Sequence, residues 1–318
     1  MRYRISTYLE LRDKNIFLEM CRIHNKAFTY DTVDTYSFLN FVTKDPNARE
    51  DLIYIAIDGK DHVLGFLVGV DVSKEPIEVV ESSRDTIWIK DFAVDPDLDR
   101  DLLKNIQLDL MKFFLNSLDG LGKKKVILYA YAPFYFMPGV NVLYEDYIEF
   151  FEELGYNKIS ENVNYEVDLT QFYYPRRIMK IEEAIRSKGI TIRRGSESDE
   201  EAIVKWVKEA FGNPFWGVET LYAFRNNPPS ILLAETNNEF IGFAVYNRMG
   251  RNEFGPIGVD GKFRGLGIGS VLLFRALSEM KLAGHRYSVV TWTTHLFFYT
   301  QVPGITRIKH YLIMSLEV

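Results

Sequence analysis

The chain alternates between two hydrophobic patterns, one typical of strands and one of amphipathic helices, and it does so twice in the same order. Each half has a predicted strand, two helical stretches, a hairpin, a further strand, a long helix and a β-branched strand. In the first half these elements are residues 3–9, 16–28, 35–42, 52–57, 63–70, 86–94, 102–118 and 125–131. In the second half they are residues 189–194, 200–211, 219–224, 231–235, 240–246, 254–259, 271–280 and 287–292. A repeat of element order over such a long period predicts two similar domains.

A proline and a change of charge mark the boundary between the halves. Residues 1–175 carry 19 Lys and Arg against 30 Asp and Glu, whereas residues 176–318 carry 19 against 14. The stretch after Pro175 has helical spacing and ends at Gly189, a residue typical of a helix C-terminus. We therefore expect a first domain at 1–175, a connecting helix at 176–189 and a second domain at 190–318. A chain of 318 residues has the usual length for two domains.

Composition excludes several classes of protein. A single cysteine, Cys21, rules out an internal disulfide, and the five scattered histidines lack the spacing of a zinc site. No apolar stretch approaches the length of a membrane span, and the N-terminus lacks the apolar core of a signal peptide. A net charge of -6 gives no reason to expect a nucleic-acid partner. We expect a cytoplasmic protein that uses no metal and binds neither membrane nor nucleic acid.

A glycine-rich loop between a predicted strand and a long helix carries the strongest chemical signal. Its sequence, GPIGVDGKFRGLGIGS, covers residues 255–270. Alternating glycines permit positive φ and close approach of a ligand, and the first N–H groups of the helix form an anion site. Arg264 adds a cation and Ser270 a hydroxyl, an arrangement that suits a pyrophosphate. The spacing fits neither the G-x-G-x-x-G dinucleotide fingerprint nor the G-x-x-x-x-G-K-S/T phosphate loop. A glycine-rich turn without a ligand remains the alternative.

The stretch Val259–Ser270 resembles the R/Q-x-x-G-x-G/A acetyl-coenzyme A motif of the GNAT family of N-acetyltransferases. The likeness covers the second half in element order, and the first half resembles a divergent second copy. It implies an α/β (α+β) fold of two tandem GNAT domains, each a mixed, mostly antiparallel twisted sheet flanked by helices. The resemblance implies pantetheine contacts by the strand, from Ile257, Gly258 and Val259. It implies coenzyme contacts by the loop from Arg264, Gly265, Leu266, Gly267, Ile268, Gly269 and Ser270.

Two residues are candidates for the catalytic chemistry. The family places a tyrosine in an FY pair near the thioester sulfur, and Phe298-Tyr299 fits, with one extra residue before the final strand. Tyr299 as a plain core aromatic is the alternative. Glu253 begins the strand before the loop, where it could accept a proton from the amine, and by alternation it would share a face with Ile257. An exposed strand-edge glutamate is the simpler interpretation, and His295 is a further titratable group that we expect in a solvent-facing loop.

The first half has lost the loop's chemistry. Aligning Val94 with Val259 places Asp99 at Arg264, Leu102 at Gly267 and Lys104 at Gly269. Every glycine is replaced, and carboxylates crowd the region where a pyrophosphate would bind. We therefore expect only the second domain to bind coenzyme.

These features predict an N-acetyltransferase that transfers an acetyl group from acetyl-CoA to a primary amine by direct attack in a ternary complex. One alternative is a non-catalytic acyl-CoA-binding sensor or regulatory protein, and another is a mycothiol-synthase-like or other small-molecule acetyltransferase. The acceptor would be a small-molecule or peptide amine, and the acidic first half would favour a cationic one by electrostatic steering. The sequence leaves the oligomeric state open.

Overall fold

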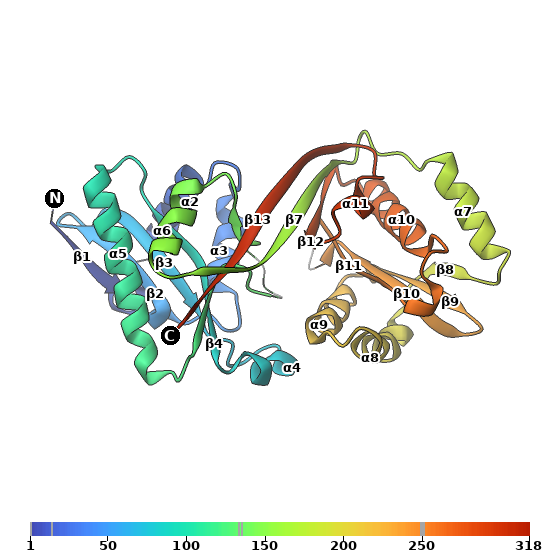
Figure 1. Cartoon of the computed structure of the whole chain (residues 1–318), viewed down its shortest axis with the longest axis horizontal. Helices are drawn as coiled ribbons and strands as arrows, with labels where there is room; N and C mark the ends of the chain where they lie inside the picture. The colour runs from blue at the N-terminus through green and yellow to red at the C-terminus, as the bar shows by residue number, and fades with distance from the viewer. Residues whose placement is uncertain (1, 14, 133, 135, 249–251) are drawn as a thin grey trace. The chain divides into compact units, whose positions relative to one another are not determined.

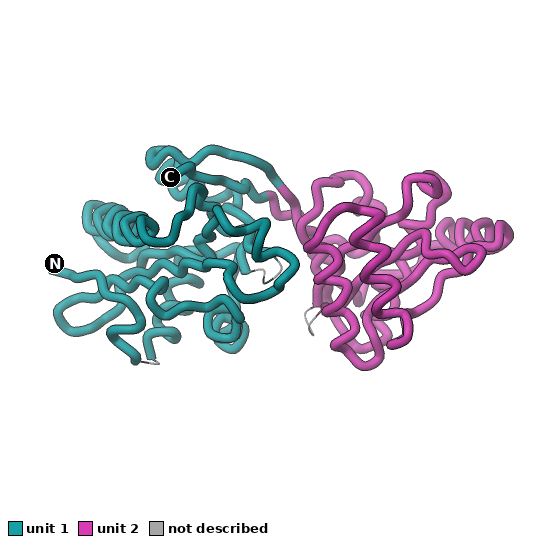
Figure 2. Tube along the Cα trace, turned by 90° about the horizontal axis from the view of Figure 1, so that it is seen from below, with its two compact units in different colours: residues 1–161, 311–318 teal, residues 162–310 magenta. Residues whose placement is uncertain are grey.

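The computed structural model describes residues 2–13, 15–132, 134, 136–248 and 252–318 (Figure 1). Within it the chain forms two compact units. Unit 1 comprises residues 1–161 and 311–318, and unit 2 comprises residues 162–310 (Figure 2). The two units share one order of elements, so the duplication predicted from the hydrophobic pattern is present in three dimensions.

Unit 1 is a sheet with helices on both of its faces. Its strands follow the order β1-β2-β3-β4-β5-β13, antiparallel except for the parallel pair β4 and β5. The strands are β1 (Tyr3–Thr7), β2 (Ile53–Asp58), β3 (Val63–Val70), β4 (Thr86–Val94), β5 (Lys125–Leu128) and β6 (Val140–Asn141). The helices are α1 (Tyr8–Leu11), α2 (Asn15–Ala27), α3 (Thr35–Thr43), α4 (Ile77–Val80), α5 (Arg100–Asn116) and α6 (Glu145–Glu153).

Unit 2 repeats this plan in the strand order β8-β9-β10-β11-β12-β7, with β11 and β12 as its parallel pair. Its strands are β8 (Thr191–Arg194), β9 (Ile231–Thr236), β10 (Glu239–Tyr246), β11 (Glu253–Val259) and β12 (Tyr287–Thr293). Its helices are α7 (Arg176–Arg186), α8 (Glu200–Phe211), α9 (Pro214–Ala223), α10 (Ile268–Leu282) and α11 (Leu296–Tyr299). Helix α9 begins earlier than its hydrophobic pattern suggested, because Asn213 caps its first turn and Pro214 fits the first helical position.

The last strand of each repeat joins the sheet of the other unit. Strand β7 (Asn157–Asp168) leaves unit 1 and pairs with β12 through residues 163–168. Strand β13 (Ile305–Glu317) leaves unit 2 and pairs with β5 through residues 314–317. The observed division therefore differs from the expected domains at 1–175 and 190–318, and the helix expected at 176–189 lies inside unit 2 as α7. Hydrophobic alternation identifies a strand but cannot show which sheet it joins.

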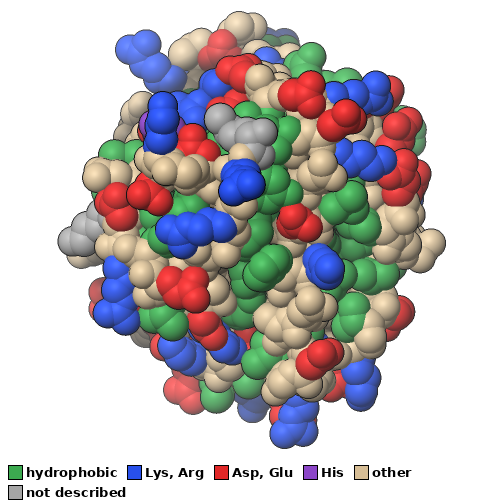
Figure 3. Space-filling view, turned by 90° about the vertical axis from the view of Figure 1, so that its left-hand side faces the viewer, with side chains coloured by type: hydrophobic (Ala, Val, Ile, Leu, Met, Phe, Trp, Pro, Cys, Tyr) green, Lys and Arg blue, Asp and Glu red, His purple; other side chains and the backbone are tan. Residues whose placement is uncertain are grey.

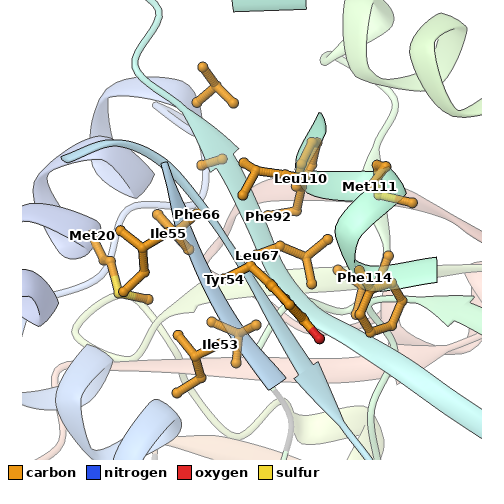
Figure 4. Packing of buried hydrophobic residues seen from close by; sticks show 14 of the residues in the cluster. Met20, Ile53, Tyr54, Ile55, Phe66, Leu67, Phe92, Leu110, Met111 and Phe114 are labelled. Atoms are coloured by element: carbon orange, nitrogen blue, oxygen red, sulfur yellow. The ribbon is translucent and has the colours of Figure 1, made fainter. Parts of the chain in front are cut away.

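The core of unit 1 fills both faces of its sheet, as Figure 4 shows. Met20 of α2 packs over Ile55 and Phe66, which are cross-strand partners on one face. On the other face Leu67 and Phe92 are partners and lie beneath α5. In unit 2 the corresponding faces carry separate clusters, one under α10 and one under α8 and α9. The α/β (α+β) fold of two similar domains, expected from the sequence, is confirmed.

Candidate active site

The site lies where β11 parts from its parallel neighbour β12. The two strands pair only at Glu253 with Val289 and at Phe254 with Val290, although β11 continues to Val259. A β-bulge shifts the register between β10 and β11 at this point, and Pro256, which has no N–H to donate to a neighbouring strand, lies within it. Beyond Phe254, β12 therefore no longer pairs with β11.

The backbone of β11 presents N–H groups along the edge that β12 no longer pairs with, called the open edge below. The N–H of Asp260 donates to the carbonyl of Ile241 on β10 at 2.9 Å. In an antiparallel ladder alternate residues point to opposite sides, so Gly258 also faces β10, whereas Ile257 and Val259 face away from it. The carbonyl of Val259 accepts a hydrogen bond from Arg264 Nε at 3.2 Å. Two of the three residues predicted to hold the pantetheine arm thus carry their polar backbone groups on the open edge.

The glycine-rich loop leads from this edge to the N-terminus of α10. Gly265 and Gly267 have φ of 80° and 84°, the left-handed region that favours glycine. Gly267 is the N-cap of α10 and supplies no side chain to the helix end. The first intrahelical bond runs from Val271 N–H to Gly267 carbonyl, so the N–H groups of residues 268–270 have no acceptor inside the helix. The N–H groups of Ile268, Gly269 and Ser270 therefore point out of the helix end, an arrangement that favours an anion, and Leu266 lies within the turn before them.

Helix α7 packs against the same loop. A Cβ atom added at Gly267 would lie 2.5 Å from Cγ2 of Ile181, so a side chain there would collide with α7. Gly265 has nothing within 4 Å of the corresponding point. The segment expected to be a connecting helix therefore supports the loop directly.

Tyr299 lies at the end of α11 and is 6% exposed. Its ring contacts Phe254, the last residue of β11 before the strands part, and Tyr165 of β7. Burial raises the pKa of Tyr299 to about 12, and a hydrogen bond from Thr293 partly opposes this increase. The phenol therefore keeps its proton at neutral pH and can act as a donor. His295 is exposed, as expected.

Glu253 lies on the opposite face of the sheet from Tyr299. Phe254 and Ile257 both belong to the cluster under α10 although they are three residues apart, because the bulge interrupts the alternation. The expectation that Glu253 shares a face with Ile257 is therefore wrong. Glu253 is half-buried on the α8 and α9 face, where its Oε2 accepts a hydrogen bond from Arg248 Nη2 at 3.0 Å.

In unit 1, the helix end equivalent to the anion site is occupied by the protein itself. Asp95 follows β4 as Asp260 follows β11, and its N–H likewise donates to the neighbouring strand, which supports the alignment of Val94 with Val259. Helix α5 begins after Asp99, whose carboxylate accepts hydrogen bonds from the N–H groups of Asp101 and Leu102 at 3.1 and 3.4 Å. A carboxylate thus takes the place that an anionic ligand would need.

The corresponding strand edge in unit 1, on β4, has hydrogen-bond partners as well. Asp91 Oδ1 accepts from the N–H of Phe92 at 2.9 Å, and Tyr129 donates its hydroxyl to the Phe92 carbonyl at 3.2 Å. The N–H of Val94 hydrogen bonds to the hydroxyl of Tyr147. The groups equivalent to those of Ile257 and Val259 therefore have partners within unit 1.

Several residues of this site were missed by sequence reasoning. Tyr165 and Asn164, which accepts from the N–H of Trp292 at 2.9 Å, come from β7 and so from the expected first domain. Only the strand exchange brings them to β12. Arg248 was missed because nothing in the sequence pattern pairs it with Glu253. Pro256 was the available signal, because a proline within a central strand marks an interrupted ladder.

In residues 2–13, 15–132, 134, 136–248 and 252–318, no group of three or more His, Cys, Asp or Glu side chains is arranged to hold a metal ion. No helix in the described parts of the chain combines the length and apolar character needed to cross a membrane.

Comparison with known proteins identifies the second half of the chain most directly. Residues 200–297 match the model of the acetyltransferase (GNAT) family. No curated protein matches the sequence. Among solved structures, one similar chain is the glucosamine N-acetyltransferase region of a fungal multi-domain GH3 β-N-acetylglucosaminidase. It has 16% identity and a TM-score of 0.79, over 99% of this chain and 38% of that chain. This chain thus spans well under half of that protein.

Two further structures match along almost their entire length. A GCN5-related N-acetyltransferase from Sphaerobacter thermophilus has 14% identity and a TM-score of 0.71, over 99% of this chain and 95% of that one. A tandem GNAT protein from the clavulanic acid biosynthesis pathway has 11% identity and a TM-score of 0.62, over 99% and 98%. At these identities the structures show a common fold. The family match therefore covers residues 200–297, and the structures show that the whole chain has the two-domain fold of tandem GNAT proteins.

Proposed function

We propose that unit 2 binds acetyl-CoA along β11 and the start of α10 and transfers its acetyl group to a primary amine. The GNAT fold supports acyl transfer in general. The observation that carries the narrower proposal is the contrast between the units. Among the described residues, the helix end of α10 has no side-chain cap and β12 stops pairing with β11 after Phe254, whereas unit 1 bonds the equivalent groups with its own side chains.

The residues present fit the coenzyme. The N–H groups of Ile268, Gly269 and Ser270, together with Arg264, suit a pyrophosphate, and the edge at Ile257 and Val259 suits an amide-rich pantetheine arm. When bound, the coenzyme supplies a thioester, an activated acyl group. That group would lie where β11 and β12 stop pairing, beside Phe254 and its ring neighbour Tyr299.

Side chains of this protein can donate and accept each proton that the transfer step requires. The amine nitrogen attacks the thioester carbon directly, so a C–N bond forms as the C–S bond breaks. N–H groups on the open edge of β11 stabilise the oxygen that becomes negative. Tyr299 donates its proton to the leaving thiolate, and Glu253 accepts the proton that the amine loses, through water where the distance requires it. Glu253 and Tyr299 lie on opposite faces of the sheet, so the amine and the coenzyme can approach from opposite sides.

We propose a cationic amine as the acetyl acceptor, because the first part of the chain is acidic. Residues 1–175 carry 30 Asp and Glu against 19 Lys and Arg, which would steer a cationic amine toward the molecule. Acidic and basic side chains are interspersed on the face drawn in Figure 3, so we attribute steering to net charge rather than to a patch on that face. One similar structure is named as a glucosamine N-acetyltransferase region. The acceptors to test are therefore glucosamine, spermidine, an aminoglycoside and a lysine-bearing peptide.

The test is turnover of these amines with acetyl-CoA, followed by release of free thiol and by the mass of the product. We expect at least one amine to gain an acetyl group in step with thiol release. Coenzyme binding without transfer to any amine would instead favour an acyl-CoA sensor. Absence of coenzyme binding would overturn both interpretations.

A further inference from the structure

A buried threonine lies against the proposed proton donor of unit 2. Thr293 is the last residue of β12 and pairs with Val163 of β7. Thr293 and Tyr299 are each 6% exposed. The Thr293 hydroxyl forms a hydrogen bond with the phenol of Tyr299. Two hydroxyl groups therefore meet where bulk water has little access.

The other contact of Thr293 leaves its own proton free for Tyr299. The backbone N–H of His295 donates to Thr293 Oγ1 at 2.9 Å, so this oxygen accepts there and keeps its proton to donate elsewhere. The bond to Thr293 also opposes the rise in the pKa of Tyr299, which is the effect that a donor has on a phenol oxygen. Thr293 therefore donates to Tyr299, and the phenol proton of Tyr299 remains available to another acceptor.

Three aromatic rings pack around Tyr299. Their centroids lie 4.9, 5.8 and 6.3 Å from its own, for Phe298, Tyr165 and Phe254 respectively. Tyr165 donates its hydroxyl to a backbone carbonyl instead of to Tyr299. Among the residues that the structure describes, Thr293 is therefore the side chain that hydrogen bonds to this phenol. A phenolate in such surroundings would be costly without a donor.

We propose that Thr293 is a positioning residue for Tyr299 during acetyl transfer. This proposal rests on the function proposed above, in which Tyr299 protonates the leaving thiolate. In that step the O–H bond of Tyr299 breaks as an S–H bond forms on the coenzyme, and the electron pair of the O–H bond stays on the phenol oxygen. Thr293 stabilises that oxygen until water returns a proton to it.

The hydrogen bond from Thr293 should act on the reaction step more than on binding. A hydrogen bond to a charged oxygen is stronger than one to a neutral oxygen, so this bond strengthens as the phenol loses its proton. Only an interaction that is stronger in the transition state than before it lowers the barrier. Loss of the Thr293 hydroxyl should therefore slow acetyl transfer and leave the affinity for coenzyme nearly unchanged.

The test is a double-mutant cycle on the single-turnover rate of acetyl transfer, with the amine of highest turnover in the acceptor panel. Thr293→Val keeps the shape of the side chain and removes its hydroxyl, so the rate should fall at least ~10-fold. In the Tyr299→Phe background the same change should have little further effect, because the phenol hydroxyl is already absent. Thr293→Ser keeps the donor and should restore most of the rate.

Ser288→Ala is the matched control. Ser288 lies near the other end of β12, is 0% exposed and donates its hydroxyl to the sulfur of Met280 at 3.5 Å. Its loss removes a buried hydroxyl that does not contact Tyr299, so the transfer rate should stay unchanged. The melting temperature and the coenzyme affinity, measured by calorimetry, report whether each variant is folded. If Thr293→Val does not fold, the smaller Thr293→Ala makes the same comparison in the same two backgrounds.

The outcomes separate this proposal from the proposed function. A fall in rate that depends on the Tyr299 hydroxyl, with rescue by Thr293→Ser, would support the positioning role. Equal falls in both Tyr299 backgrounds, or an unchanged rate in folded Thr293→Val, would overturn that role and leave acetyl transfer intact. An unchanged rate in Tyr299→Phe would overturn it as well. A wild-type protein that acetylates no amine would overturn the proposed function, and the positioning role with it.

Discussion

Units 1 and 2 build the same parted strands and the same strand-to-helix turn, and they treat the exposed backbone in opposite ways. In unit 1, Asp99 caps the helix end, and Tyr129 and Tyr147 bond to the strand edge. In unit 2, glycine replaces the cap, and β12 does not pair with β11 at Ile257 and Val259. Buried backbone groups need partners; unit 1 supplies them from its own side chains, and we propose that a coenzyme supplies them in unit 2.

This comparison gives the loss of glycines in unit 1 a structural meaning. Absence of a motif shows only that one way of binding is gone. Asp99 and the two tyrosines are side chains of unit 1 that bond to its helix end and strand edge. Under the proposed function, these bonds replace the ones that a coenzyme would make, so unit 1 has closed its site and unit 2 has kept it.

The largest expected effect on kcat distinguishes Tyr299 of unit 2 from Tyr129 of unit 1. Tyr299→Phe keeps the ring but removes the proposed proton donor, so kcat should fall ~100-fold or more while coenzyme affinity changes little. Tyr129→Phe removes the hydroxyl that bonds to the Phe92 carbonyl in unit 1 and should leave kcat unchanged. Steady-state kinetics and calorimetry on both variants check this. Equal effects of the two changes on kcat would contradict the assignment of catalysis to unit 2.

The second prediction puts a carboxylate into the loop of unit 2. The helix cap Asp99 of unit 1 corresponds to the cap Gly267 of unit 2, which corrects the expected alignment of Asp99 with Arg264. Arg264→Asp introduces a carboxylate shortly before that cap and removes a charge-assisted hydrogen bond worth ~1.5–3 kcal/mol. Coenzyme affinity should fall at least ~10-fold, as measured by calorimetry. Lys262→Asp is the control for charge alone and should have a much smaller effect. Asp99→Arg should not create a second site, because Tyr129 and Tyr147 still occupy the strand edge.

The third prediction compares the two exchanged strands. Tyr311 of β13 donates its hydroxyl to the Asp31 carboxylate at 2.6 Å inside unit 1. Tyr165 of β7 donates to the neutral carbonyl of Leu296 in unit 2. Tyr311→Phe should therefore lower the free energy of unfolding by ~1.5–3 kcal/mol and Tyr165→Phe by ~1 kcal/mol. Urea unfolding measures both, and exposed Tyr287→Phe should have no effect. A larger loss in Tyr165→Phe would refute this ranking.

The smallest expected effect concerns His24, which is buried with Asp91 in unit 1. Burial alone would lower the pKa of His24, but the Asp91 carboxylate, 2.9 Å from Nδ1, raises it above its ordinary 6.5. Because the folded pKa is the higher one, stability from this pair is fully present below pH 6.5 and is lost as pH rises through the folded pKa. His24→Gln should therefore flatten the dependence of unfolding free energy on pH above 6.5. An unchanged slope in that variant would contradict this role for His24.

Much of the fold could be predicted because each element carries its own signal. The hydrophobic pattern identified strands and helices, and the glycines after Val259 identified the turn before α10. The exchange of β7 and β13 could not be predicted, since a strand's alternation is the same whichever sheet it joins. The face of Glu253 was missed for a related reason. One extra residue in a β-bulge reverses which face of the sheet the following side chains occupy, and the hydrophobic pattern does not show where that extra residue lies.

The central claim, that one unit binds coenzyme and the other has closed its site, is tested most directly by calorimetric titration of the intact chain with coenzyme A. The account predicts one site per chain, and it predicts that Arg264→Asp weakens that site while Asp99→Arg leaves it unaltered. Two equivalent sites in the wild-type chain, or one site that Arg264→Asp leaves at full affinity, would contradict it.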